Sequence, residues 1–510
     1  MKKPAIALVI AFSLLNTSGI RAQKEGPRDQ NEFVKSYDAY IKNTMEKVPD
    51  IPGFAVVVIK DDKPIFVKAY GMADKEAGVR SDVDTLYYIA SSTKSFTALA
   101  AALLDREGKI KLDDPVSKYS NGVAFKTRLP EKITVRDLLT HTSGLRNGPL
   151  VFRMAYSGES DAADMKRVFG SATTFTEERY GKYNYDNLGY NIYAVLLQNH
   201  LGLKWQDVLQ SKVFDPIGLK HTTAYVSKAK RKKYKIAAPY MYDPASGKEI
   251  RAPLEKVDNN MQSAGGMFAS VSDIGRWLNL NMNDGMLDGK QVIPAEVMRA
   301  VHTGFTATTR DAPPFSGEGQ YGLGWQIGKY RNEKVIYHHG GFPGYRSHIS
   351  YLPEKKIAIA VLVNDGFAGS RAADMFATFG YDWWLGLDGF QAAYDKELQN
   401  LADRYAQAVE QMRADVATRA KRTSQLTKPL GDYAGKYVND DLGAIIVSNT
   451  GTDLMVKMGN IKVTATNFTQ RETIRVEMVP GSGEVIKFNK TADGKVDSLT
   501  YAGATFTRIS

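Results

Sequence analysis

The hydrophobic pattern of this chain changes its period twice, and these changes constrain the fold more than any other feature of the sequence. Helical and strand patterns alternate over residues 25–390, apolar residues recur every three or four positions over 391–425, and they recur at every second position after about 430. A helical repeat indicates a helix and strict alternation indicates a strand. The 510 residues are also too many for one hydrophobic core. We therefore predict an α+β domain over 25–390, a helical linker over 391–425 and a small antiparallel β-barrel-like domain over 426–510.

Local patterns predict individual elements within these parts. Residues 52–70 form two apolar runs around Asp61-Asp62-Lys63, which is typical of a β-hairpin. The alanine- and leucine-rich segment Phe96–Leu104 predicts a buried helix that ends near Gly108. The apolar stripe of 391–425 is expected to pack against a neighbouring domain, with a coiled-coil partner as the alternative.

The amino terminus has the pattern of a secretory signal. Lys2 and Lys3 precede a short apolar run, Pro4–Leu15, and a small-residue cleavage site follows at Ala22. The run is shorter than the roughly 20 residues needed to cross a bilayer. We predict that residues 1–22 are a signal peptide and that the mature protein is exported to the periplasm or the exterior without stable membrane insertion. An uncleaved anchor is the alternative.

The sequence contains no cysteine and seven histidines. The missing cysteines exclude a disulfide scaffold, a thiol nucleophile, an iron–sulfur cluster and a zinc site with cysteine ligands. The chemistry of this chain therefore depends on hydroxyl, amine, imidazole and carboxylate groups.

The net charge of +11 does not indicate a nucleic-acid-binding protein. Such proteins concentrate basic residues on one face beside a recognisable motif, whereas the densest basic run here is the short segment Lys228–Lys235. We expect this run to be a solvated loop, with a contact to an anionic cell-envelope polymer as the alternative.

The first candidate catalytic motif is Ser91-Ser92-Thr93-Lys94, which begins the predicted helix. A spacing of three places Ser91 and Lys94 on one helix face, where a lysine neutralised by burial can accept the serine proton. Backbone N–H groups at a helix amino terminus can also stabilise an oxyanion. The same spacing recurs at Ser227 and Lys230 within the basic run, where we interpret it as coincidence.

The second motif is Tyr185-Asp186-Asn187. A phenol beside a cationic lysine can transfer a proton, and an amide two residues later can hold a substrate carbonyl. The same spacing recurs at Tyr437 and Asn439 in the β domain, so this motif is weak by itself.

The third motif is His338-His339-Gly340-Gly341. A metal centre needs more ligands than this pair provides, and His348 is the only other imidazole nearby in the sequence, so we expect no metal here. Glycines directly after an imidazole indicate instead that the backbone closely approaches a substrate.

The three motifs, in this order, resemble those of the serine β-lactamase and penicillin-binding-protein-like family, specifically its class C branch of serine hydrolases. Four further segments carry the resemblance: Gly53–Asp74, Ile133–Leu145, Ala264–Phe268 and Tyr321–Trp325. Residues 430–510 are similar to the lipocalin-like β domain that follows the catalytic domain in some members.

The resemblance implies an antiparallel sheet flanked by helices, a helical subdomain, and an active site between the two. It implies that Ser91 is the nucleophile and that Lys94 and Tyr185 share the role of general base. It implies no cofactor, and the expected partner is a small-molecule or short-peptide substrate such as a cell-wall peptide. Nothing in the sequence specifies an oligomeric state.

The remaining site residues also come from the resemblance. Asn187 is expected to contact the substrate amide, and His338 occupies the first position of the third motif. Gly340 and Gly341 are expected to bind substrate through their backbone, with the N–H groups of Ser91 and Gly341 forming the oxyanion hole.

The third motif differs from that of class C β-lactamases, which usually carry lysine where this chain has His338. This difference favours a peptidase or esterase. His339 and Gly341 also lack the hydroxyl that helps family members to bind a substrate carboxylate, and Tyr345, Arg346 or a protonated His339 are the candidates to replace it.

We expect a secreted serine hydrolase that forms an acyl-enzyme on Ser91 and cleaves small or D-amino-acid-containing peptides, or related amides and esters. A β-lactamase or penicillin-binding D-alanyl-D-alanine carboxypeptidase is the alternative within this class. A catalytically silent protein that binds the cell envelope through its β domain and basic run is the alternative from another class.

Overall fold

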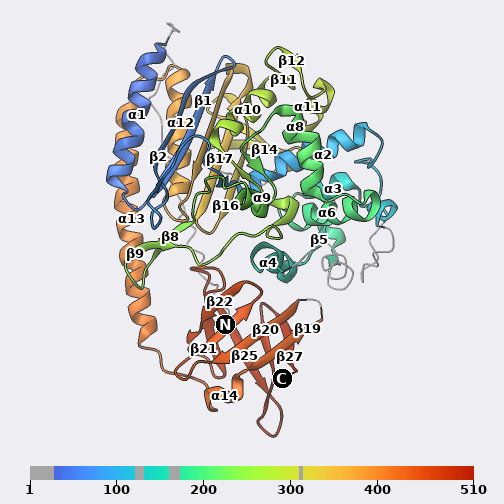
Figure 1. Ribbon diagram of the computed structural model, residues 1–510, viewed down its shortest axis with the longest axis vertical. Helices are drawn as coiled ribbons and strands as arrows, with labels where there is room; N and C mark the ends of the chain where they lie inside the picture. Colours follow the sequence, from blue (N-terminus) through green and yellow to red (C-terminus); the bar gives the residue numbers. More distant parts are fainter. Residues whose placement is uncertain (1–27, 121–130, 160–172, 309–313, 441, 510) are drawn as a thin grey trace.

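Two separate nine-stranded antiparallel sheets organise the chain (Figure 1). The computed structural model describes residues 28–120, 131–159, 173–308, 314–440 and 442–509. The signal peptide expected over 1–22 lies outside these ranges.

The first sheet has two buried strands at its centre. Its strands, in spatial order, are β13 (Thr306–Thr308), β14 (Ser316–Tyr321), β15 (Gln326–Tyr330), β16 (Glu333–Phe342), β17 (Tyr345–Leu352), β18 (Ile357–Val363), β1 (Gly53–Lys60), β2 (Lys63–Asp74) and β3 (Val79–Arg80). The side chains of β1 and β18 are almost entirely apolar because helices cover both faces of the sheet there. β1 and β2 form the predicted hairpin, and Asp61 and Asp62 have φ values of 48° and 66° at its turn, as a two-residue turn between twisted strands requires.

One face of this sheet is covered by helices from the two ends of the domain. α1 (Gln30–Lys47), α12 (Gly369–Trp384) and the first half of α13 (Phe390–Ala420) lie side by side on it (Figure 1). Their aromatic side chains interlock, as in the stacked rings of Tyr40 and Phe379 at 4.5 Å. This packing fixes α12 against β17 and β18.

The opposite face carries α10 (Val271–Met282) and the helical subdomain. The helices of that subdomain and its margins are α2 (Thr93–Arg106), α3 (Val135–Leu139), α4 (Gly148–Tyr156), α6 (Leu188–Leu201), α7 (Trp205–Leu209), α8 (Asp215–Ile217), α9 (Val226–Arg231) and α11 (Ala295–Val301). Short strands lie between these helices in the chain. A small three-stranded sheet contains β4 (Tyr87–Tyr88), β10 (Phe268–Ala269) and β7 (Thr222–Thr223). Three two-stranded sheets are formed by β5 (Leu145–Arg146) with β6 (Thr174–Phe175), β8 (Tyr240–Asp243) with β9 (Lys248–Arg251), and β11 (Met286–Leu287) with β12 (Lys290–Gln291). α2 contains the predicted helix Phe96–Leu104 and is buried along nearly its whole length.

The basic run Lys228–Lys235 is solvated as expected, with most of its charged side chains exposed, but it is not entirely a loop. Its first part belongs to α9, because Val226 and Ala229 lie on one helix face and are buried against the core. Two of its charges are paired locally, Lys230 with Glu255 and Lys235 with Asp82.

The long helix α13 begins at Phe390, as the apolar stripe predicts, and ends at Ala420 rather than at 425. Its first half packs on α1 and α12 through side chains that include Tyr394 and Leu398. The helix stops early because the β domain engages the backbone beyond it: the N–H of Glu472 donates to the carbonyl of Gln425 at 3.0 Å. Among the described residues, no helix combines the length and apolar character needed to cross a bilayer.

The second sheet is the predicted carboxyl-terminal β domain. After the short α14 (Leu430–Tyr433), its strands in spatial order are β22 (Ile461–Thr464), β21 (Leu454–Met458), β20 (Gly443–Asn449), β19 (Gly435–Asn439), β27 (Ala504–Arg508), β26 (Val496–Tyr501), β25 (Glu484–Lys490), β24 (Thr473–Val476) and β23 (Thr466–Asn467). Alternate side chains such as Ile445, Val447 and Phe488 fill its interior. This nearly closed antiparallel sheet confirms the predicted barrel-like fold of the carboxyl-terminal part, as the first sheet with its flanking helices confirms that of residues 25–390.

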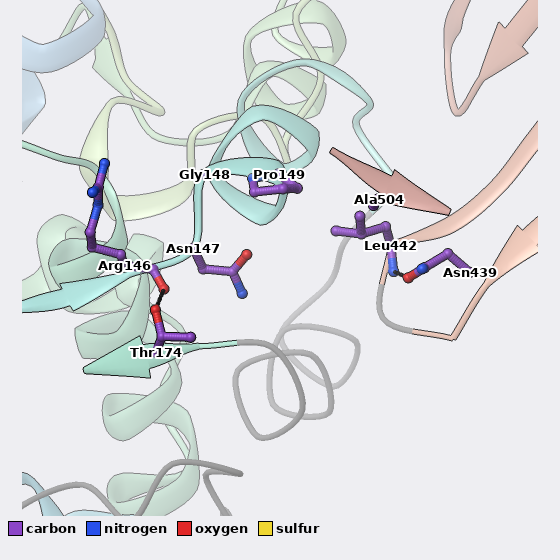
Figure 2. Close-up of a pocket in the computed structure, with 8 residues that line it drawn as sticks. All are labelled: Arg146, Asn147, Gly148, Pro149, Thr174, Asn439, Leu442 and Ala504. Carbon is purple, nitrogen blue, oxygen red and sulfur yellow. Dashed lines mark hydrogen bonds between the residues drawn. The ribbon is translucent and has the colours of Figure 1, made fainter. Parts of the chain in front are cut away.

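The β domain packs against the region around α4. The N–H of Asn460 donates to the carbonyl of Ser157 at 2.9 Å, and the ring of Tyr501 lies 6.2 Å from that of Phe152. A cavity of about 440 Å³ remains between the two parts (Figure 2); it is lined by Arg146, Asn147, Gly148, Pro149 and Thr174 on one side and by Asn439, Leu442 and Ala504 on the other. None of the predicted catalytic residues lines this cavity.

Candidate active site

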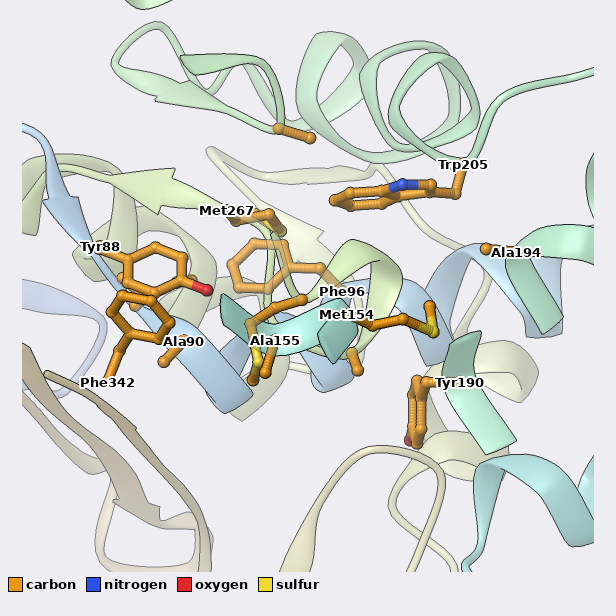
Figure 3. Packing of buried hydrophobic residues seen from close by; sticks show 14 of the residues in the cluster. Tyr88, Ala90, Phe96, Met154, Ala155, Tyr190, Ala194, Trp205, Met267 and Phe342 are labelled. Atoms are coloured by element: carbon orange, nitrogen blue, oxygen red, sulfur yellow. The ribbon is translucent and has the colours of Figure 1, made fainter. Parts of the chain in front are cut away.

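Ser91 lies in a strained turn at the start of α2. The 3₁₀ turn Ala90–Ser92 leads directly into the helix, and Ala90 has φ 45°, a left-handed conformation that is uncommon for a residue with a side chain. Figure 3 shows Ala90 beside the paired rings of Tyr88 and Phe342, which are 5.0 Å apart. Packing therefore holds a turn that leaves Ser91 half-buried while Ala90 is fully buried.

The next serine anchors this turn to the sheet. The hydroxyl of Ser92 donates to the carbonyl of His338 at 3.2 Å and contacts the hydroxyl of Ser347 at 2.9 Å. Ser347 in turn donates to the carbonyl of Ile89 at 2.9 Å. These contacts join the amino terminus of α2 to β16 and β17, so the first and third motifs meet at one place.

Lys94 lies one helical turn beyond Ser91, with its amine fully buried. Its Nζ is 3.2 Å from Ser91 Oγ, 2.8 Å from Asn187 Oδ1 and 2.7 Å from the carbonyl oxygen of Ala264. Burial lowers the pKa of Lys94 to about 7. The last two contacts are to oxygens that only accept hydrogen bonds. A neutral amine has two N–H groups for them, which leaves its lone pair for the Ser91 hydroxyl.

The Tyr185-Asp186-Asn187 motif reaches the same amine from the start of α6. Lys94 Nζ lies 5.0 Å from the centre of the Tyr185 ring, close enough for a cation–π interaction when the amine is protonated. Asp186 Oδ1 accepts from the N–H of Leu188 at 2.8 Å and so fixes the beginning of the helix. Burial raises the pKa of Asp186 to about 6.

His338 enters the site from β16 as a neutral hydrogen-bonding group. Its Nδ1 lies 2.8 Å from the carbonyl of His339, and because a carbonyl only accepts, Nδ1 carries the proton. Nε2 is then the acceptor for the Tyr321 hydroxyl at 3.3 Å. Burial, aided by the charge of Lys94, lowers the pKa of His338 to about 3. His338 therefore does not supply the positive charge that a lysine at this position would.

The two glycines of the third motif lie on a partly open strand. β15 pairs with β16 only as far as Tyr337, whereas β17 pairs with it as far as Phe342. Within the described residues, the segment 338–342 therefore has a neighbouring strand on one side only. Gly340 must be glycine, because a Cβ there would lie 2.0 Å from the carbonyl oxygen of Ile89. Gly341 is exposed.

Of the three candidates for carboxylate binding, His339 points to the opposite face of the sheet. Successive side chains of a strand alternate between faces, so His338 faces the site while His339 faces α12. The His339 ring stacks on Phe315 at 6.1 Å, and its Nε2 lies 3.2 Å from Nδ1 of His348.

Tyr345 is also occupied elsewhere, because its hydroxyl donates to the carbonyl of Ala237 at 2.6 Å. Of the three candidates, Arg346 is the one that lies beside the glycines. A Cβ atom placed on Gly341 would be 3.4 Å from Nη1 of Arg346. Its guanidinium donates to the carbonyls of Phe342 and Tyr345 at 3.1 and 2.8 Å. Arg346 thus stabilises the turn between β16 and β17.

Sequence reasoning missed a group of rings that surround Tyr185. The His141 ring lies 4.5 Å from that of Tyr185, 4.8 Å from that of Tyr321 and 5.5 Å from that of Tyr190. Burial lowers the pKa of His141 well below its usual value, so this imidazole is neutral. His141 and Tyr321 do lie in two segments that carry the family resemblance, and this was the available signal.

The duplicate motifs lie away from this cluster and have other partners. Ser227 donates to Asp258 at 2.5 Å, and Lys230 is paired with Glu255. The side chain of Asn439 donates to the carbonyl of Thr505 within the β domain.

The assembled groups suit acyl transfer through a serine hydroxyl. They provide an oxygen nucleophile, a buried amine of pKa about 7 in contact with it, and an amide bound to that amine. A free strand edge lies beside them. A serine activated by an adjacent base is the usual arrangement for this chemistry.

Comparisons with known proteins give an independent assignment. The family described as Beta-lactamase matches residues 38–378. The protein named "Unguisins hydrolase ungD" of Aspergillus violaceofuscus is 24% identical over 428 residues, which cover 78% of this chain and 74% of that protein. "Protein flp" of Staphylococcus aureus is 24% identical over 346 residues, which cover 66% of this chain and 64% of that protein.

A solved structure shows the same fold. The octameric penicillin-binding protein homologue from Pyrococcus abyssi superposes with a TM-score of 0.58 at 22% identity, covering 93% of this chain and all of that one. The family match spans the Ser91, Tyr185 and His338 motifs. This chain therefore belongs to the β-lactamase family and is a serine hydrolase of that family.

Proposed function

We propose that this protein is an exported hydrolase that forms an acyl-enzyme on Ser91 and cleaves short peptides, with D-amino-acid-containing peptides as the leading substrate class and esters as a second one. The observation that carries the proposal is the 3.2 Å contact between Lys94 Nζ and Ser91 Oγ. The other two contacts of that amine are to acceptors only, which directs its lone pair toward the serine.

In the proposed reaction, Ser91 Oγ attacks the substrate carbonyl carbon as its proton passes to neutral Lys94. The N–H groups of Ser91 and Gly341 stabilise the oxyanion of the tetrahedral intermediate. Its collapse breaks the C–N or C–O bond, and the leaving group takes the proton from Lys94, relayed by Tyr185. Water then attacks the acyl-enzyme, loses a proton to Lys94 and releases the acid, which restores the Ser91 hydroxyl.

Two features of the surroundings favour short substrates. The ring of Tyr156 packs on Phe342, one residue after Gly341, at 5.5 Å. Tyr156 belongs to α4, and the β domain packs on this helix, with the rings of Phe152 and Tyr501 6.2 Å apart. The β domain thus approaches the end of β16 and restricts the space available to a long chain.

The residues of the third motif are poorly suited to binding a free carboxylate group of a substrate. His338 is neutral, His339 faces α12, and Gly341 has no hydroxyl. This arrangement favours peptidase or esterase activity over β-lactamase or carboxypeptidase activity. The name of the Aspergillus relative, a hydrolase of unguisins, agrees with a hydrolytic function.

A substrate panel tests this proposal. We expect the mature protein to turn over D-aminoacyl anilides or short acyl esters at least tenfold faster than D-alanyl-D-alanine peptides or nitrocefin. The measurement is kcat/KM for each substrate, with intact-protein mass spectrometry after incubation with penicillin. Preferred turnover of nitrocefin, or a stable penicillin adduct on Ser91, would instead establish the β-lactam alternative.

The pH profile tests the role of Lys94. Burial lowers the pKa of this amine to about 7, so the neutral base predominates above that pH and the inactive ammonium predominates below it. We expect kcat/KM to rise with pH through about 7 and then level off. His338, with its pKa lowered to about 3, stays neutral throughout and does not cause the step. A profile that is flat from about pH 5 to 9 would contradict this assignment.

A further inference from the structure

A second cluster of chemically active side chains lies on the opposite face of the sheet from the proposed active site. It consists of His339 on β16, His348 on β17 and Asp374 on α12. His339 and His348 are direct partners across the two strands, and α12 places Asp374 over both of them. The proposed hydrolysis uses none of these three groups.

The distances within this cluster suit a single metal ion. His339 Nε2 lies 3.2 Å from His348 Nδ1 and 3.4 Å from Asp374 Oδ1. Tetrahedral ligands with bonds of about 2.0–2.1 Å lie about 3.3–3.4 Å apart. The third pair, His348 Nδ1 and Asp374 Oδ1, is 2.7 Å apart and shares a hydrogen bond that a metal ion would replace.

We propose that His339, His348 and Asp374 bind one Zn²⁺ ion, with the fourth position open to solvent. Two imidazoles and one carboxylate are a ligand set that zinc favours. The side chain of His348 is 1% exposed, that of Asp374 15% and that of His339 31%, so the cluster is anchored inside and accessible on the His339 side.

The surroundings prepare His348 as a ligand through Nδ1. Its other nitrogen lies 2.7 Å from the hydroxyl of Ser350, which is itself 2.6 Å from the hydroxyl of Tyr381. Such an outer hydrogen bond fixes the orientation and tautomer of a metal-binding imidazole. The hydrogen bond with His348 and the nearby His339 and Arg371 lower the pKa of buried Asp374, so its carboxylate is ionised, as a metal ligand must be.

A bound ion would join α12 to β16 and β17 directly behind the strand that carries His338. Because the ligands come from three elements that are apart in the unfolded chain, the ion binds the folded state preferentially and raises its stability. The expected effect of the ion is therefore on stability, and the inference does not depend on the substrate of the enzyme.

Zinc binding to chelator-treated full-length protein tests this inference. We expect isothermal titration calorimetry to give about one Zn²⁺ per chain, and Co²⁺ to give the intense visible absorption of a tetrahedral site. Zn²⁺ should also raise the Tm in a concentration-dependent way. The Ser91→Ala variant should bind identically, so loss of hydrolysis and loss of metal binding are separate results.

Variants of the cluster decide whether it is the site. We expect H339A and D374N each to weaken Zn²⁺ binding at least tenfold. The matched control is H221A, because His221 pairs with Asp84 at 3.2 Å without a third ligand group among the described residues. If the wild-type protein binds no Zn²⁺, or if D374N and H339A bind it as the wild type does, the cluster is only a hydrogen-bonded chain and the inference is wrong. If a variant does not fold, the Co²⁺ spectrum of the wild type decides the question. Intense visible absorption supports a tetrahedral site, and its absence contradicts one.

Discussion

Ser91→Ala is expected to lower kcat/KM by about 10⁴-fold or more, because it removes the atom that forms the acyl-enzyme. The fold should be unaffected, since Ser91 is half-buried and its hydroxyl contacts the Lys94 amine rather than a structural partner within the described part of the chain. The measurement is steady-state turnover of the best substrate in the panel, together with the mass of the intact protein during turnover.

A second serine in this chain provides the control. Ser227 has the same S-x-x-K spacing to Lys230, but its hydroxyl donates to Asp258 and Lys230 pairs with Glu255 instead. Ser227→Ala should keep activity within about twofold of the wild type. Activity of Ser91→Ala within tenfold of the wild type would show that another group is the nucleophile. Absence of turnover by the wild type on every substrate of the panel would instead support the catalytically silent alternative.

Lys94→Met is expected to lower kcat/KM by about 10²–10⁴-fold, the usual contribution of a general base. Methionine has a similar length and preserves packing, but it leaves Asn187 Oδ1 and the carbonyl of Ala264 without their donor. Unsatisfied buried acceptors cost about 1–3 kcal/mol each. The Tm should therefore fall modestly, and the measurement must pair kinetics with thermal unfolding.

The pH profile of Lys94→Met shows whether Lys94 acts as the general base or only stabilises the fold. In Lys94→Met the rise of kcat/KM through about pH 7 should disappear along with the rate, because the titrating amine is gone. Lys256 is the matched control: burial also lowers its pKa to about 7, but its amine donates to the carbonyls of Val257 and Asn260. Lys256→Met should lower the Tm while retaining the pH step. A retained step in Lys94→Met would assign the titration to another group.

The elements of this protein could be predicted where the pattern is local. The hairpin around Asp61 and Asp62, the helix that contains Phe96, and the alternation of the carboxyl-terminal strands follow from short-range sequence periods, and all are present. The end of α13 was predicted too late, because a contact between Gln425 and the β domain, rather than the helical pattern, determines it.

The members of the candidate site could be named from the sequence, but the pKa shifts of its charged groups could not. The three motifs identify Ser91, Lys94, Tyr185 and His338, and strand alternation implies that His338 and His339 face opposite ways. No sequence pattern shows that Lys94 is fully buried against two acceptors, although this burial lowers its pKa to about 7. The neutral state of His338 likewise depends on burial and on the nearby charge of Lys94.

The sequence by itself determined the family, the order of the elements and the groups available for chemistry, because each depends on neighbouring residues or on composition. The tertiary structure alone decided which groups meet. Asp374 joins His339 and His348 only because α12 packs across the sheet. The turn that carries Ser91 adjoins the strand of His338 only because Ser92 and Ser347 join that turn to β16 and β17. Contacts of this kind link residues far apart in the chain, and the periodicity of a single segment carries no information about them.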